Sequence, residues 1–351
     1  MRRVAKIGVG IVIAAGLLWL LFRNTTIAEL WDAVRRQDIR WLLASQIAVA
    51  LGVVVRVQRW DYIVRPVQPV SFRHLLSATQ IGYTANFVLP FRLGEIVRAL
   101  TLTRLTGIAV AKAVALAAMD RVADLFGMAI VMAIAAFAMW NTADLELPRE
   151  TLGLPKDVVF SAAQVRAAAA ITGGLVVVAI PVMAALYLNQ ARALQVIRAI
   201  VGRISRRFAD WSCRLLTQAA GGLMVFESGR ALAMALAMTL VTWASYLLAT
   251  QCLVYAFHIQ APWFFAFAQI AILGVGISVP STPGLLGQYQ VPIVVALSML
   301  VPGLPDTQAK AFALVSYFAL EAPVVLLGVI CLALEKLNLF ELTAETPNAP
   351  K

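Results

Sequence analysis

A series of long apolar runs, separated by short polar stretches, constrains the fold of this chain more than any other feature. The first run extends from Ile7 to Phe22. The others cover about 41–57, 72–89, 108–119 joined to 120–140, 166–188, 231–257, 263–279, 285–301 and 309–334. A helix that crosses a bilayer needs about 20 mostly apolar residues. The pattern therefore predicts an all-α polytopic membrane protein with about 6–8 spans.

The composition excludes most soluble classes of protein. Of the 351 residues, 61% are hydrophobic and 13% are charged, and the mean hydropathy is +0.84. A soluble domain is about half apolar and about a quarter charged. Too few polar residues remain to cover a surface that faces water, so a soluble enzyme, a disordered chain and a DNA-binding protein are excluded. We expect a single membrane domain over residues 1–351.

The charge balance and the cysteines point away from nucleic acid, metal and redox cofactors. The net charge is +11, which in a membrane protein is explained by arginines in cytoplasmic loops beside anionic lipid. Cys213, Cys252 and Cys331 lie far apart, and His74 and His258 are isolated. No Cys or His cluster with the spacing of a metal site is present. We expect no cofactor, no bound metal and no nucleic-acid partner.

Loop charges predict the orientation of the chain in the cytoplasmic (inner) membrane. The 189–230 segment carries seven arginines against two acids, so it is placed in the cytoplasm. The 141–157 segment has four acids against two basic residues, and 280–309 has no Lys or Arg, so both are placed outside. The N-terminus and the C-terminus are then both cytoplasmic.

These placements agree only if two segments are broken or re-entrant hairpins. One hairpin is 72–119, entering from the cytoplasm, and the other is 263–301, entering from outside. The expected parts are a first span (1–22), an amphipathic surface stretch (24–40), an N-terminal half (41–188), a basic cytoplasmic linker (189–230), a C-terminal half (231–335) and a tail (336–351). Inverted halves with interrupted helices are a recurrent transporter design.

The first polar cluster surrounds a helix break at Pro90, which lacks a backbone N–H. Its candidate headgroup residues are Asn86, Arg92, Glu95 and Arg98. Guanidinium groups match phosphate oxygens, so Arg92 and Arg98, with Arg104 further on, can hold a phosphate. Glu95 and Arg98 can also pair on a helix. The alternative is an ordinary cytoplasmic loop that follows the positive-inside rule.

A polar stripe precedes that break. Thr79, Tyr83 and Asn86 lie on one helical face, with Gln80 and Thr84 beside it. Such a stripe in a short apolar helix is expected to face the bundle interior. Its role is either contact between helices or a path for a lipid headgroup.

The second cluster is Asp120, Arg121 and Asp124, embedded in apolar sequence. Charges at membrane depth are costly and usually paired. Arg121 can pair with Asp124 in the same helix or with Glu95 across the hairpin. The cluster is a candidate headgroup site, and a purely structural ion pair is the alternative.

The third cluster combines two prolines and two glycines between apolar runs. Ser281, Thr282, Gly284 and Gln290 are its candidate headgroup residues. Broken helices free backbone N–H groups, and a following helix directs its positive end toward an anion. A plain external loop is the alternative.

Glu321 lies in the middle of the last apolar run, with Pro323 just beyond. An intramembrane carboxylate is by default a functional candidate, here for a proton or a headgroup contact. A hydrogen-bonded structural glutamate is the alternative.

The three clusters together resemble the flippase-like membrane family that includes the transmembrane part of lysylphosphatidylglycerol synthases. The resemblance runs from Arg56-x-x-Arg59-Trp60 to the last run. It rests on Asn86, Pro90, Gly94-Glu95 and Arg98, on Asp120-Arg121 and Asp124, and on Pro283-Gly284 and Gly287. Gln290 stands where the family often has Glu, which puts an acid role at that position in doubt.

The resemblance implies flippase-like movement of a lipid or a lipid-linked saccharide. The expected partners are membrane lipids with an anionic or phosphate-bearing headgroup, and further a second copy of the chain or a separate lipid-synthesis enzyme. No HExxH, GxSxG or Walker A motif is present, so an enzyme is not expected. Because the sequence ends at Lys351, we expect a stand-alone flippase-like protein without a synthase domain.

Two other functions stay open. The first is an integral-membrane transferase or hydrolase acting on a lipid head, for which Glu95, Asp120 and Asp124 are the only candidate catalytic acids. The second is a non-catalytic scaffold of a lipid or glycan pathway.

Overall fold

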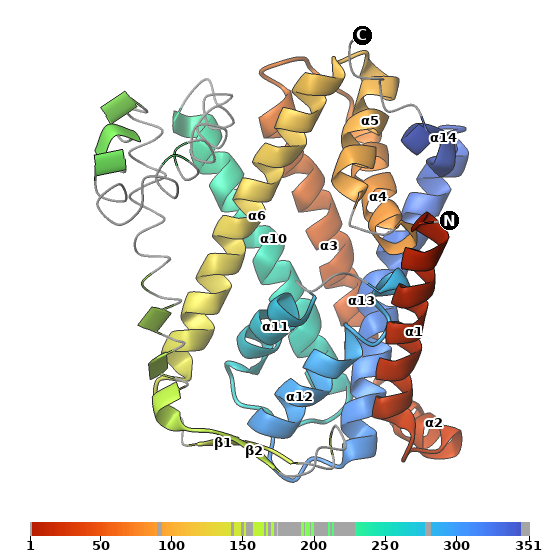
Figure 1. Ribbon diagram of the computed structural model, residues 1–351, viewed down its shortest axis with the longest axis vertical. Coiled ribbons are helices and arrows are strands. Elements are labelled where there is room, and N and C mark those ends of the chain that lie inside the picture. The colour runs from red at the N-terminus through yellow and green to blue at the C-terminus, as the bar shows by residue number, and fades with distance from the viewer. Residues whose placement is uncertain are drawn as a thin grey trace.

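The structure is a computed structural model that describes residues 2–89, 93–141, 144–148, 157–164, 229–277 and 282–344, with scattered residues between 151 and 213. The fold is all-α (Figure 1). The helices are α1 (Arg2–Phe22), α2 (Ile27–Arg35), α3 (Ile39–Val64), α4 (Phe72–Val88), α5 (Gly94–Thr106), α6 (Val110–Ala138), α10 (Gly229–Ala256), α11 (Phe265–Gly276), α12 (Gln290–Leu300), α13 (Asp306–Leu334) and α14 (Leu339–Ala344). Two short strands, β1 (Leu145–Leu147) and β2 (Val158–Phe160), pair antiparallel.

Four of the described helices, α3, α6, α10 and α13, are long and apolar enough to cross a membrane. The end of α1 and α2 pass the same test only as a pair bent by 76°, which raises the number to five. The predicted count of 6–8 spans is therefore not confirmed. The predicted span at 166–188 and the basic linker at 189–230 lie almost entirely outside the described residues. The chain is a multi-pass membrane protein by the length and composition of its helices.

Within the first predicted hairpin, 72–119, α4 packs against the following helix, but the second arm was wrongly placed at 108–119. The arm that packs against α4 is α5, and α5 ends at Gly107, whose φ of 75° terminates the helix. Residues 110–119 instead belong to α6, which continues without a break to Ala138. The charges at 120–124 do not interrupt α6 because each is neutralised by a partner inside the protein.

The second hairpin is formed by α11 and α12, joined by the one-turn 3-10 helix η2 (Pro283–Leu285). Figure 1 shows α4 and α5 in the upper part of the molecule and α11 and α12 in the lower part. The two hairpins meet where η2 contacts α4. This contact brings interrupted backbone from both halves toward the middle of the bundle.

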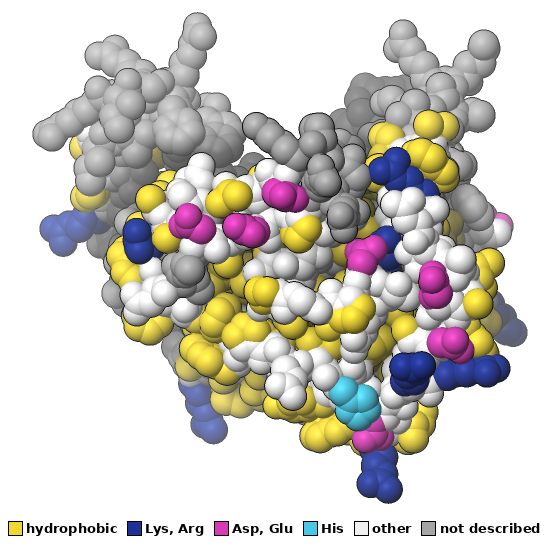
Figure 2. Space-filling model, turned by 90° about the horizontal axis from the view of Figure 1, so that it is seen from below, with side chains coloured by type: hydrophobic (Ala, Val, Ile, Leu, Met, Phe, Trp, Pro, Cys, Tyr) yellow, Lys and Arg dark blue, Asp and Glu magenta, His cyan; other side chains and the backbone are white. Residues whose placement is uncertain are grey.

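The long helices form the frame that carries these hairpins. The most extensive packing is that of α3 along α10, and α13 packs against α4. Buried aromatic side chains, among them Trp60, Phe265 and Phe312, fill the space between helices. Figure 2 shows the molecule from below, where acidic and basic side chains lie among a mostly hydrophobic surface.

Close approach of α4 and α5 depends on a glycine. A methyl group at Gly82 would lie 2.8 Å from Cβ of Arg98 and 2.9 Å from the carbonyl oxygen of Gly94. We expect Gly82→Ala to destabilise the protein by about 1–3 kcal/mol through overpacking. Gly16→Ala in α1 is the matched control, because nothing lies within 4 Å of the added methyl.

The control is expected to be neutral or stabilising by about 0.5–1 kcal/mol, the usual gain from replacing glycine inside a helix. Thermal unfolding of the two purified variants measures the difference. Equal melting temperatures would contradict the tight α4–α5 contact.

Candidate functional site

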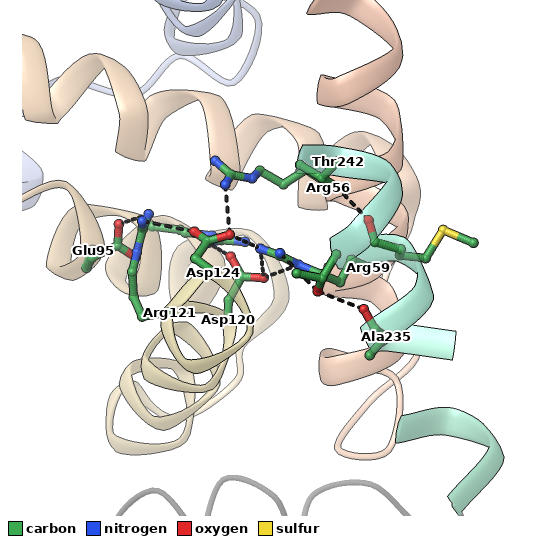
Figure 3. Close-up of polar contacts among 11 residues, drawn as sticks. Arg56, Arg59, Glu95, Asp120, Arg121, Asp124, Ala235 and Thr242 are labelled. Atoms are coloured by element: carbon green, nitrogen blue, oxygen red, sulfur yellow. Dashed lines mark hydrogen bonds and ion pairs between the residues drawn. The ribbon is translucent and has the colours of Figure 1, made fainter. Parts of the chain in front are cut away.

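An ion-pair network lies where α3, α5 and α6 meet (Figure 3). Asp120 of α6 is fully buried and accepts hydrogen bonds from Arg59 Nε at 3.0 Å and Arg98 Nη1 at 2.5 Å. Asp124, one turn later, accepts bonds from Nη2 of Arg56 and of Arg59, each at 2.8 Å. The two carboxylates thus join α6 to α3 and α5 in the bundle interior.

Local helix geometry explains why these groups meet. Asp120 and Asp124 are four residues apart and lie on one face of α6, while Arg56 and Arg59 are three apart and lie on one face of α3. Arg98 reaches them from α5, and its guanidinium carbon lies 3.6 Å from the centre of the Trp60 ring. A desolvated cation over an aromatic face is stabilised by the ring quadrupole.

Arg121 makes both of the contacts predicted from the sequence. It pairs with Asp124 at 3.1 Å in α6 and with Glu95 of α5 across the hairpin. The expected pair between Glu95 and Arg98 is not formed, since each of them is bonded to α6 instead. The acidic and basic residues of the first two clusters therefore form one network.

The network carries more positive than negative charge. Its four guanidinium groups (Arg56, Arg59, Arg98 and Arg121) face three carboxylates (Glu95, Asp120 and Asp124), which leaves one positive charge in surplus. All three carboxylates are paired with arginine, and the described residues contain no group of three His, Cys, Asp or Glu placed to hold a metal. The surplus charge is a feature that suits an anion.

A cavity of about 260 Å³ adjoins this network. Its walls come from α3, α4 and α6 of the N-terminal half and from α10, α11 and α13 of the C-terminal half. Arg56 links the cavity to the network, because it lines the wall and also bonds Asp124. The guanidinium of Arg56 is held between two aromatic rings, 5.0 Å from Tyr83 and 5.6 Å from Tyr246.

The cavity wall holds several buried polar atoms that lack a hydrogen-bond partner among the described residues. They are Arg56 Nε, Gln80 Oε1, Tyr83 Oη, Trp243 Nε1 and Gln269 Oε1. Buried polar groups in native proteins are nearly always paired with protein, water or ligand. Five unpaired groups around one cavity could therefore bind a polar molecule.

Glu321 lines the same cavity from α13. Its carboxylate forms no hydrogen bond and no ion pair within 4.0 Å with the described residues. In this it differs from the carboxylates of the network, which are paired with arginine. The cavity thus has a guanidinium in one wall and a carboxylate in another. Such a pair can bind an anionic group and a hydroxyl or amino group of one ligand.

The polar stripe of α4 faces the bundle interior, as predicted. Thr79, Gln80 and Thr84 are buried. Thr84 donates a hydrogen bond to the carbonyl oxygen of Val325 in α13, whereas Gln80 and Tyr83 line the cavity. Contact between helices is thus confirmed for Thr84, and the headgroup role of the stripe stays a prediction.

Of the three arginines predicted to hold a phosphate, Arg92, Arg98 and Arg104, the structure describes the last two. Arg98 is buried against Asp120, while Arg104 is exposed in the last turn of α5. Arg92 lies outside the described residues. Asn86 accepts a 2.7 Å hydrogen bond from the N–H of Gly94, so its side chain ties the two arms of the hairpin together.

The third cluster is turned inward on itself. Thr282 donates from its N–H to Gln288 and from its hydroxyl to the carbonyl of Leu286, so neither group is free for a headgroup. Gln290 Oε1 accepts from the N–H of Gly287 at 2.7 Å, and Ser281 lies outside the described residues.

Gly284 has a φ of 65°, and its carbonyl accepts a 2.5 Å hydrogen bond from the hydroxyl of Tyr317 in α13. Within the described residues, side chains thus satisfy the N–H groups of Thr282 and Gly287 and the carbonyl of Gly284, and the predicted bare-backbone site stays a prediction.

Sequence reasoning missed most of the cavity wall. Arg56 and Arg59 lie at the end of an apolar run. In the sequence they therefore look like ordinary charged residues at the end of a membrane span. Their spacing of three residues on one helical face is the signal that could have identified them. Trp243, Tyr246 and Gln269 are uncharged residues in apolar helices, so only the packing of α10 and α11 reveals them.

Comparison with known proteins identifies the family. A family described as lysylphosphatidylglycerol synthase TM region matches residues 7–328 of the chain. No curated protein sequence matches the chain. The family match includes the ion-pair network, every wall of the cavity and both hairpins. The chain therefore belongs to the lysylphosphatidylglycerol synthase TM region family.

Proposed function

We propose that the protein moves a lipid with a phosphate-bearing headgroup across the membrane, and that the cavity between its halves receives this headgroup. The family implies a role related to membrane lipids. The observation that carries the proposal is the set of unpaired polar atoms around the cavity. Each unpaired buried polar group costs about 1–3 kcal/mol, a penalty that a polar ligand relieves.

The charges of the cavity favour a phosphate. Arg56 belongs to the network with one positive charge in surplus, and its Nε lacks a partner among the described residues. Guanidinium N–H groups bind phosphate oxygens strongly. Gln80, Gln269 and Glu321 supply acceptors for hydroxyl or amino groups on the same headgroup. A lipid phosphate and a lipid-linked saccharide phosphate share this chemistry.

The environment of the three candidate catalytic acids favours translocation over the alternative of a transferase or hydrolase. General acid–base catalysis needs a carboxyl group that can exchange a proton with substrate. Asp120 is fully buried and bonded to two arginines, and Glu95 and Asp124 are also paired with arginine. These carboxylates have the environment of structural ion pairs.

Reconstitution tests the proposal. The purified full chain is placed in vesicles of phosphatidylglycerol and phosphatidylethanolamine that contain a panel of labelled lipids, including diacylglycerol without phosphate. We expect protein-dependent movement of at least one phosphate-bearing lipid and none of diacylglycerol above vesicles without protein. A new lipid species in the mass spectrum would favour an enzyme, and no movement of any lipid would contradict the proposal.

A further inference from the structure

We call the cavity lined by Arg56 and Glu321 the headgroup cavity. An apolar cavity lies beside it, between α2, α3 and α13. This groove has a volume of about 700 Å³. Its lining is apolar or aromatic except for Gln46, and includes Leu30 and Val34 of α2, Leu43 of α3, and Val315 and Phe318 of α13. Leu43 and Phe318 are exposed. In a membrane protein, an open apolar groove of this kind suits a lipid acyl chain.

The groove and the headgroup cavity follow the same seam between α3 and α13. On α3, Gln46 lines the groove and Val49, less than one turn later, lines the cavity. On α13, Ala319 lines the groove and Leu320 lines the cavity. The two spaces are therefore adjacent, with the polar one further along both helices. A lipid also has a polar head joined to apolar chains.

One side-chain hydrogen bond closes this seam among the described residues. Gln46 Nε2 donates to the carbonyl oxygen of Ala319 at 3.0 Å. That carbonyl is available because Pro323, four residues later, has no N–H to complete the helix. Beyond this bond, the seam is filled by Val49, Leu320 and Val324, which are aliphatic. The closure is thus weak, and it lies at a proline, where helices bend.

We propose that the α3–α13 seam is a lateral entrance, through which a headgroup passes from the bilayer into the cavity while an acyl chain of the same lipid occupies the groove. This inference rests on the proposed function. It assigns the groove to an acyl chain, and it assigns to Gln46 and Ala319 the contact that must open.

Cross-linking across the seam tests the entrance. Gln46→Cys and Ala319→Cys are combined in a chain whose three native cysteines are replaced by serine, and a short flexible bis-maleimide joins them. The control joins α4 to the residue after α13 through Arg73→Cys and Glu335→Cys, whose native side chains bond each other at 3.2 Å away from the cavity. We expect the seam cross-link to lower lipid movement at least about tenfold, because the opening step is blocked. The control cross-link is expected to leave the rate within about twofold.

The outcomes separate the entrance from the proposed function. Normal movement with the seam locked, while Glu321→Leu is inactive, would overturn the entrance and leave the headgroup cavity standing. A wild-type chain that moves no lipid would overturn the proposed function.

Photolabelling of the wild-type chain tests the groove without a transport assay. Phosphatidylglycerol with a diazirine in one acyl chain is incorporated into the same vesicles. We expect adducts to be enriched on Val315 and Phe318 over Val329 and Ile330, which are exposed on the same helix. Equal labelling of both pairs would overturn the assignment of the groove.

Discussion

Replacing Asp120 by asparagine is expected to cause the largest loss of stability of any single change considered. The carboxylate is fully buried and bonded to Arg59 and Arg98, so its neutralisation leaves Arg98 without its ion-pair partner and leaves Arg59 with Asp124 alone. Breaking a buried pair in this way typically costs about 3–5 kcal/mol. The yield of membrane-inserted protein and its melting temperature in detergent measure the effect.

Asp61→Asn provides the control for Asp120→Asn. Asp61 pairs with Arg65 one turn along α3, and the side chain of Arg65 is 64% exposed. Exposed pairs contribute only about 0–1 kcal/mol. If the two variants lost equal stability, the network would not be the structural centre of the N-terminal half. A partial rescue of Asp120→Asn by Arg98→Gln is also expected, because the second change removes the cation that lost its ion-pair partner.

Glu321→Leu is expected to have the opposite signature, with large loss of activity and no loss of stability. The carboxylate lines the cavity and has no ion pair among the described residues, so its removal relieves an unfavourable unpaired charge within a membrane helix. We expect an unchanged or raised melting temperature. Lipid movement should fall about 10- to 100-fold, because a hydrogen bond to a charged group contributes about 1.5–3 kcal/mol.

A glutamate at the end of the same helix serves as the control. Glu335 follows α13 and bonds Arg73 and Ser77, away from the cavity. Glu335→Gln is expected to leave the rate of lipid movement within about twofold, as for surface changes remote from a site. A Glu321→Leu variant that is fully active would remove this carboxylate from the headgroup site.

Much of the fold can be predicted from the sequence because membrane burial leaves few choices. Apolar runs identify α3, α6, α10 and α13, and helix breaks near Pro90 and Pro283 identify two interrupted hairpins. The error at 108–119 has a physical cause. Asp120 and Arg121 look like the end of an apolar segment, yet α6 passes through them because partners from α3 and α5 neutralise the charges.

Only part of the site can be predicted from the sequence, because the site also depends on contacts between helices. Pairing of Arg121 with Asp124 and Glu95 follows from helical spacing and is confirmed. The headgroup roles of the predicted residues stay a prediction. The cavity depends on how six helices meet, and its uncharged wall residues Trp243 and Gln269 are indistinguishable in sequence from ordinary packing residues.

The charged groups of the network are paired, whereas several polar atoms of the cavity wall are not. Asp120 and Asp124 link α6 to α3 and α5 through ion pairs, while the side-chain oxygens of Gln80 and Gln269 in the cavity wall lack a partner among the described residues. Binding sites commonly sacrifice stability for function in this way. The two aspartates therefore stabilise the fold, whereas we propose that the residues of the cavity wall contact the ligand.

The most direct test of the headgroup cavity is photolabelling from the headgroup of a bound lipid. A phosphatidylglycerol analogue with a photoreactive group on its glycerol head is incorporated into vesicles with the wild-type chain, and the adducts are mapped by mass spectrometry. We predict adducts on Tyr83, Trp243 or Gln269, and we expect an excess of unlabelled phosphatidylglycerol to reduce their yield. Adducts confined to residues at the two ends of the helices, with none in the cavity wall, would contradict this prediction.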